Sequence, residues 1–129
     1  MLIVEDRKSL RIILRQALEQ AGFEVTEVHT VGAAKDLLRR EDFDLLTLDM
    51  QLPDSTREET VKLIPVWSPS VPIIVITGTG DPDFVTEVFD QGASGYLSKD
   101  CNLVEQLPSL ARGALAGTRL HRAFHPAAA

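Results

Sequence analysis

Residues 71–78 read Val71-Pro72-Ile73-Ile74-Val75-Ile76-Thr77-Gly78, the most apolar run of the chain. The run is short, rich in β-branched residues and stops abruptly at two small residues, which predicts a strand. Because apolar and polar residues do not alternate along it, both faces of this strand should be buried. Such a strand is typical of a parallel sheet that helices cover on both sides.

Other segments fit the same sheet. Strands are predicted at 2–4, 43–48 and 95–98, and the alternation of Phe23, Val25 and Val28 predicts one more. Apolar residues at helical spacing predict intervening helices, whose inward residues include Leu10, Ile13, Leu14, Ala34, Leu37, Leu38, Val61, Ile64, Phe84, Val85, Val88, Phe89, Leu103, Leu107, Leu110 and Ala114. The sequence therefore predicts an α/β fold with a doubly wound five-stranded parallel sheet and five flanking helices.

Several residues mark where the helices begin and end. Thr30 and Asn102 are predicted N-caps, and Asp81 is a third, followed by Pro82 in the first turn. Another helix should begin near 55–56. Pro65 is expected to end or kink that helix, and Pro108 to kink the last one.

Composition limits the classes of protein that the chain can represent. It has 129 residues, 44% hydrophobic and 25% charged, with a net charge of −6 and a single cysteine, Cys101. These values indicate one folded domain, in a reducing compartment such as the cytoplasm, without a disulfide framework. The acidic balance argues against binding to nucleic acid or anionic lipid, and no apolar run is long enough for a membrane span.

Polar side chains stand where four of the predicted strands end. Glu5 and Asp6 follow the first strand, Asp49 the third, Thr77 the fourth and Lys99 the fifth. In an open parallel sheet these ends lie along one edge, where such folds bind their ligands. We therefore expect three carboxylates, a hydroxyl and an ammonium group to converge in one crevice.

The carboxylates call for a counter-charge. Two carboxylates about 4 Å apart near a surface repel by roughly 4 kcal/mol, and Lys99 offsets only part of this. Oxygen ligands of this kind suit Mg²⁺. His29, His121 and His125 form no competing cluster for a softer metal; the last two lie in the tail and are interpreted as solvent-exposed.

The chain resembles the receiver domain of two-component response regulators. The resemblance runs from Leu2 to about Leu115 and rests on four motifs: Leu-Ile-Val-Glu-Asp (2–6), Leu-Asp-Met-Gln-Leu-Pro-Asp (48–54), Val-Ile-Thr-Gly (75–78) and Gly-Ala-Ser-Gly-Tyr-Leu-Ser-Lys-Asp (92–100). It implies a flavodoxin-like strand order 2-1-3-4-5, a receiver domain over 1–117, and a C-terminal tail or start of a linker over 118–129.

By the same resemblance, Asp49 is the phosphoacceptor. Asp6 and the Gln51 backbone carbonyl join Asp49 as Mg²⁺ ligands, and Glu5 holds metal-bound water. Thr77, Gly78 and Lys99 bind the phosphoryl group.

Tyr96 is the implied switch residue, which rotates toward the space that Thr77 vacates; the alternative is an ordinary half-buried tyrosine of a strand. The face made by the last two helices and the strand at 95–98 would then change. That change would bias partner binding, with homodimerisation through this face among the outcomes.

Several features depart from the family pattern, among them Pro65 and Pro108 inside predicted helices. The segment 53–57 lacks the glycine usual after the phosphorylation-site loop, and Asp100 stands where many receivers have proline. The resemblance implies a signalling domain, not an enzyme with turnover, whose partner is a histidine kinase or histidine phosphotransfer protein. Only the last predicted helix and a short tail follow Lys99, so we expect no DNA-binding or enzymatic output segment within these 129 residues. The domain is either a stand-alone receiver or part of a longer regulator or hybrid kinase.

Three alternatives stay open. A Mg²⁺ phosphohydrolase of the haloacid-dehalogenase type would need an acid two residues after its nucleophile, where Gln51 stands. A flavin or nucleotide binder would need a phosphate-cradling loop after the first strand, where Glu5 and Asp6 stand. A receiver-shaped interaction module that acts without phosphorylation is the strongest competitor.

Overall fold

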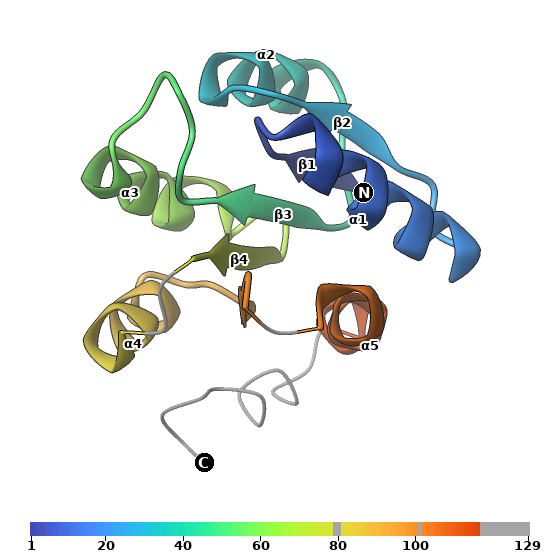
Figure 1. Cartoon of the computed structure of the whole chain (residues 1–129). Helices are drawn as coiled ribbons and strands as arrows, with labels where there is room; N and C mark the ends of the chain where they lie inside the picture. Colours follow the sequence, from blue (N-terminus) through green and yellow to red (C-terminus); the bar gives the residue numbers. More distant parts are fainter. Residues whose placement is uncertain (79–80, 101, 117–129) are drawn as a thin grey trace.

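The computed structural model describes residues 1–78, 81–100 and 102–116. The elements alternate along the chain as β1 (Leu2–Val4), α1 (Lys8–Gln20), β2 (Thr26–Val28), α2 (Val31–Arg40), β3 (Leu46–Asp49), α3 (Arg57–Trp67), β4 (Ile73–Thr77), α4 (Pro82–Asp90), β5 (Gly95–Ser98) and α5 (Leu103–Leu115). All strand pairs are parallel, in the order β2-β1-β3-β4-β5. The predicted fold class and strand order are confirmed (Figure 1).

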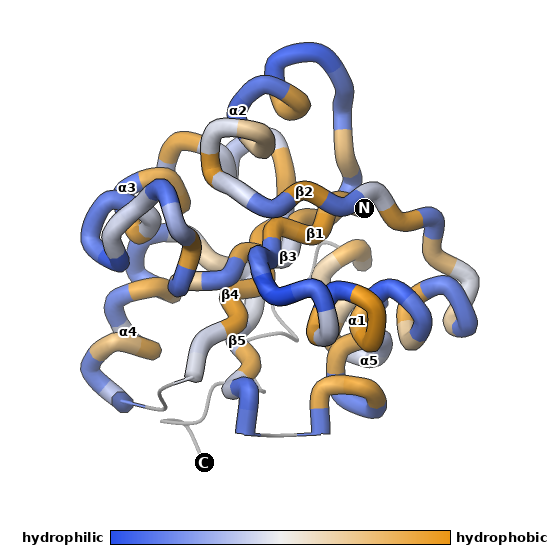
Figure 2. The backbone as a smooth tube through the Cα atoms, turned by 45° about the horizontal axis from the view of Figure 1, so that its top comes forward, coloured by the Kyte–Doolittle hydropathy of each residue, from blue (hydrophilic) through white to orange (hydrophobic). Residues whose placement is uncertain are grey.

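The sheet separates two apolar layers. Side chains of β3 and β4 such as Leu48 and Val75 pack in one cluster with residues of α2, α3 and α4. Ile74 and Ile76 point to the other face and pack with residues of α1 and α5. The strands at the centre of the molecule are largely hydrophobic, while the helices around them alternate between hydrophilic and hydrophobic stretches (Figure 2). Burial on both faces explains why these strands show no polar alternation.

The predicted helix starts are confirmed by their capping bonds. Thr30 Oγ1 accepts from the amide of Ala33, and Asn102 Oδ1 accepts from the amide of Glu105. Asp81 caps α4, with Pro82 in the first turn. Thr56 begins α3 with a capping box, in which its side chain and that of Glu59 bind each other's backbone amides.

The prediction that Ile13 faces the core is wrong. This side chain is 46% exposed, whereas Arg11 is buried on the same helix together with Leu14 and Leu18. The buried stripe of α1 runs through Arg11, Leu14, Ala17 and Leu18, and Ile13 lies to one side of it.

Two strands are shorter than predicted. β2 begins at Thr26, so Phe23 and Val25 precede it, and β3 begins at Leu46, beyond Phe43. Phe23 and Phe43 are partly buried against the two clusters from positions outside the ladder. The apolar character of Phe23 and Phe43 therefore indicates that they are buried, not that they pair in a strand.

The prolines do not end their helices. α3 continues past Pro65 to Trp67, and α5 runs through Pro108 to Leu115. Every peptide bond in the described segments is trans, including Lys99–Asp100. Glycines with positive φ follow two helices: Gly22 after α1 and Gly92 after α4.

Some predictions fall on residues outside the described ranges, namely those for Cys101, His121, His125 and the tail at 118–129. The domain boundary at 117 therefore stays a prediction. In the described segments, no helix has both the length and the apolar character needed to cross a bilayer.

Candidate functional site

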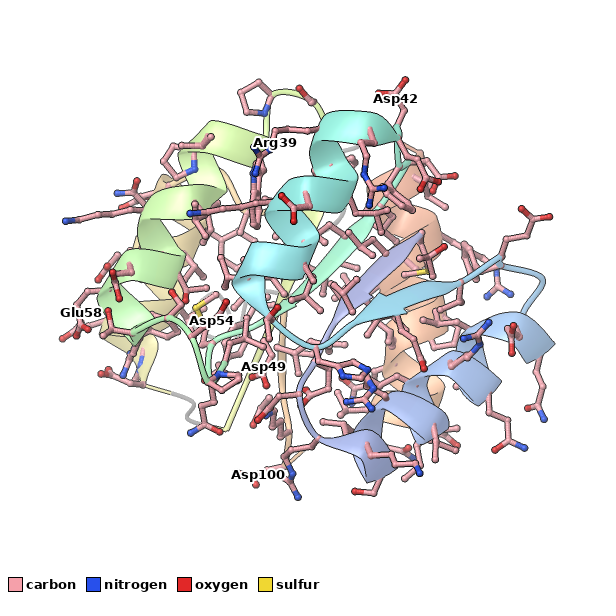
Figure 3. The ribbon with its side chains drawn as sticks, turned by 90° about the horizontal axis from the view of Figure 1, so that it is seen from above. Arg39, Asp42, Asp49, Asp54, Glu58 and Asp100 are labelled. Carbon is pink, nitrogen blue, oxygen red and sulfur yellow. The ribbon has the colours of Figure 1, made fainter. Side chains whose placement is uncertain are left out.

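The predicted site residues lie at one edge of the sheet. Glu5 and Asp6 directly follow β1, and Asp49 and Thr77 are the last residues of β3 and β4. Lys99 follows β5, where its amide donates to the Thr77 carbonyl at 2.8 Å. Because every strand runs in the same direction, all these residues reach the same edge (Figure 3, where Asp49 is labelled).

Three carboxylates form the centre of this site. One oxygen from each of Glu5, Asp6 and Asp49 lies within 4.8 Å of the other two. Glu5 and Asp49 are each only 1% exposed, whereas Asp6 is exposed to solvent. The site therefore has a buried acidic floor and one acidic side chain at its mouth.

Lys99 supplies the positive charge. Its Nζ lies 3.0 Å from Asp49 Oδ1 and 3.7 Å from Glu5 Oε1, with the side chain 11% exposed. One ammonium group thus faces two buried carboxylates, so it neutralises only part of their charge.

This imbalance appears in the protonation of Glu5. Burial is the main cause that raises the pKa of Glu5 from 4.5 to about 7, and the negative charge of Asp49 acts in the same direction. The Arg7 amide, which donates to Glu5 Oε2 at 3.0 Å, and the charge of Lys99 act in the opposite direction. The ionised form of Glu5 is therefore disfavoured in the metal-free site.

Arg11 belongs to the site although the sequence reasoning missed it. Its buried guanidinium donates through Nη1 to the backbone carbonyls of Glu5 (3.1 Å) and Asp6 (2.8 Å). Arg11 thus holds the backbone of Glu5 and Asp6 in place, and its hydrogen bonds do not occupy their carboxylates. The signal was present: Arg11 shares the buried stripe of α1 with Leu14 and Leu18.

The loop after β3 also contacts Asp49. The Gln51 amide donates to Asp49 Oδ1 at 3.0 Å, which fixes one oxygen of this carboxylate. The other oxygen, Oδ2, is buried and has no hydrogen-bond partner within the described residues. Asp49 therefore has one oxygen held in place and one available.

Comparison with known proteins accounts for this arrangement. The model of the response regulator receiver domain matches residues 1–110. The chain belongs to this family.

Relatives and solved structures agree with the assignment. The chain is 37% identical over 106 residues to the KDP operon transcriptional regulatory protein KdpE of Escherichia coli (strain K12), covering 81% of this chain and 46% of KdpE. It is 34% identical over 114 residues to the response regulator protein FleR of Pseudomonas aeruginosa, covering 88% of this chain and 24% of FleR. It thus spans between about a quarter and a half of the length of these two relatives.

Two crystal structures share the architecture. A CheY-like response regulator receiver domain protein from Methanospirillum hungatei JF-1 superposes with a TM-score of 0.79 at 27% identity, covering 90% of this chain and 92% of the other. A LuxR-family two-component response regulator from Aurantimonas sp. SI85-9A1 gives 0.80 at 28% identity, covering 92% and 85%. The chain is therefore a receiver domain of the two-component type.

Thr77 and Gly78 are the predicted site residues at the end of β4. Thr77 is buried and pairs in register with Ser98 of β5. A Cβ built on Gly78 would meet no atom within 4 Å, so space is open beside this residue. Thr79, the next residue, lies outside the described ranges.

Tyr96 lies deeper in the receiver domain than the half-buried alternative supposed. It is only 3% exposed and belongs to the apolar cluster that contains Phe84, Val85 and Val88 of α4. In the ladder, Tyr96 of β5 pairs with Val75 of β4. Val75 is two residues before Thr77 on that strand. Tyr96 therefore lies near the site along the sheet, and its side chain belongs to the apolar layer between the sheet and α4.

The acidic floor fits a hard divalent cation. Within the described residues, Glu5 Oε1 and Asp49 Oδ2 are buried without a hydrogen-bond partner. Leaving buried acceptors unpaired costs about 1–3 kcal/mol each, and more for charged groups. A cation with oxygen ligands, such as Mg²⁺, would satisfy both and offset the excess charge.

Proposed function

We propose that this receiver domain accepts a phosphoryl group from a histidine kinase or histidine phosphotransfer protein onto Asp49. The observation that carries the proposal is the Asp49 carboxylate: Oδ1 is held by the Gln51 amide, and Oδ2 is buried and unpaired. A carboxylate of this kind is held in one orientation, and its charge is poorly compensated.

The proposed step forms one bond and breaks one. One oxygen of the Asp49 carboxylate attacks the phosphorus of a phosphohistidine, the new O–P bond gives an acyl phosphate, and the P–N bond breaks. Its electron pair returns to the imidazole nitrogen of the donor. This is phosphoryl transfer in line, in which the protein contributes positioning and charge compensation.

Mg²⁺ would be held by Asp6, Asp49 and the Gln51 carbonyl, with Glu5 binding through water; when bound, it supplies positive charge beside the transferring oxygens. Arg11 keeps the backbone of Glu5 and Asp6 in place for this role. Lys99, 3.0 Å from Asp49 Oδ1, offsets charge on a phosphoryl oxygen. Thr77 and the Gly78 amide complete the set of groups around the phosphoryl.

Switching would follow from the new negative charge at the site. The Thr77 hydroxyl moves toward the phosphoryl oxygens, and Tyr96 responds to the space behind β4. Tyr96 packs with Phe84 and Val88, so its rearrangement would shift α4 and alter the α4-β5-α5 face. Partner binding or dimerisation through that face is the proposed output.

The test uses a small phosphodonor. Incubation with acetyl phosphate and Mg²⁺, read by intact mass, should add one phosphoryl group to the wild type and none to Asp49→Asn. Asp90→Asn, a change at an exposed aspartate of α4, is the matched control and should be modified normally.

The same experiment separates the alternatives. The absence of an adduct with acetyl phosphate, and of a beryllofluoride complex, would favour a receiver-shaped module that works without phosphorylation. Rapid multiple turnover of the donor would instead favour a phosphohydrolase. A mass adduct that persists in Asp49→Asn would place the phosphoacceptor elsewhere.

A further inference from the structure

Asp54 joins two segments that are far apart in the chain. It lies in the loop between β3 and α3, and its carboxylate accepts two backbone hydrogen bonds from the start of α2. The Val31 amide donates to Oδ1 and the Gly32 amide to Oδ2, each at 2.9 Å. Figure 3 shows Asp54 beside the first turn of α2.

These bonds complete the first turn of α2. Thr30 Oγ1 already accepts from the amide of Ala33, so Asp54 takes the two amides that this local cap leaves over. A negative charge at a helix N-terminus is favourable, and the two bonds lower the pKa of Asp54.

Three other contacts restrain the loop that carries Asp54. At its start, the Gln51 amide is bound to Asp49 Oδ1. In its middle, Leu52 forms an isolated antiparallel bridge with Ser55. At its end, Thr56 caps α3. These contacts hold the loop internally and to α3, and Asp54 adds the link to α2.

We propose that Asp54 is a positioning residue for the cation site: by tying this loop to α2, it fixes the Gln51 backbone beside Asp49. The proposal rests on the proposed function for the ligand role of the Gln51 carbonyl. It also explains how a loop without the usual glycine is held, since a link to a neighbouring helix replaces a tight turn.

The matched control is Thr30, which caps the same helix but makes no link to the loop. Both Asp54→Ala and Thr30→Ala remove capping bonds from α2, so both should destabilise the helix. Only Asp54→Ala should weaken Mg²⁺ binding, by about tenfold in calorimetric titration, as expected when a group that orients a metal ligand is lost. Asp54→Asn keeps one oxygen acceptor and should fall between Asp54→Ala and the wild type.

A second readout needs no cation. Hydrogen exchange of the Gln51 amide in metal-free protein should be faster in Asp54→Ala than in Thr30→Ala, because only the former frees the loop. Should Asp54→Ala prove too unstable, the same comparisons with Asp54→Asn decide the question.

The outcomes are distinct. Equal Mg²⁺ affinity and equal Gln51 exchange in the Asp54 and Thr30 variants would reduce Asp54 to a helix cap and overturn the proposal. A wild type that binds no Mg²⁺ would overturn the proposed function and, with it, the role of Asp54 at a cation site. Gln51 exchange would then still decide whether Asp54 orders the loop.

Discussion

The ammonium group of Lys99 lies 3.0 Å from Oδ1 of Asp49, although one residue follows β5 and the other ends β3. Lys99 also lies 3.7 Å from Oε1 of Glu5. A single cation between two buried carboxylates leaves the site with net negative charge. The predictions that concern the site follow from this imbalance.

Lys99→Met should slow phosphorylation of Asp49 without abolishing the acidic cation site. Loss of a charged group aimed at the transferring oxygens typically costs about 10²–10³ in rate. The rate with acetyl phosphate, followed by intact mass, measures this effect. Lys62→Met removes an exposed lysine of α3 and should react at the wild-type rate. A rate for Lys99→Met within a few-fold of wild type would exclude this role for Lys99.

Glu5 should make the metal-free protein less stable as pH rises. Its folded-state pKa of about 7 lies above the ordinary value of 4.5, so the folded protein binds this proton more tightly than the unfolded chain. Stability therefore falls between these two values, and the full penalty applies above about pH 7.

Glu5→Gln removes this penalty. The variant should gain stability on the order of 2 kcal/mol near pH 8 and little near pH 4. Urea unfolding without metal, followed by the fluorescence of the half-buried Trp67, measures the difference. Parallel stability–pH curves for the two proteins would show that burial does not perturb Glu5.

Mg²⁺ should stabilise the wild type against unfolding, because the folded state gathers the three carboxylates. At about a hundredfold excess over the dissociation constant, the gain is about 2.7 kcal/mol. Asp6→Asn should lose most of this gain at the same Mg²⁺ concentration. Asp6 is exposed, so the substitution should hardly change the stability of the metal-free protein. Equal Mg²⁺ stabilisation of both proteins would remove Asp6 from the ligand set.

Gly92→Ala should destabilise the domain by about 1–3 kcal/mol. Gly92 has a φ of 118°, and a Cβ there would lie 2.6 Å from Ser68 Oγ. Gly113→Ala in α5 is the contrast, since a Cβ there meets nothing within 4 Å. It should add about 0.5–1 kcal/mol through helix propensity. Thermal or urea unfolding of both variants tests the pair, and effects of the same sign would contradict the argument.

Much of the site could be predicted from the sequence because it depends on where strands end. Polar residues directly after buried runs identified Glu5, Asp6, Asp49, Thr77 and Lys99. Parallel strands bring such residues to one edge without further information. Arg11 escaped because an arginine in an amphipathic helix is ordinarily taken for a surface residue.

Patterns of apolar residues by themselves determined the number and order of the elements. A strand buried on both faces requires a continuous apolar run, and a helix packed on the sheet requires an apolar stripe. The tertiary structure alone decided which oxygens of Glu5 and Asp49 remain unpaired, how deeply Tyr96 is buried, and that Asp54 binds the start of α2. These features depend on distances and angles between segments remote in sequence. Local periodicity carries no record of them, because it reflects only which side of each element avoids water.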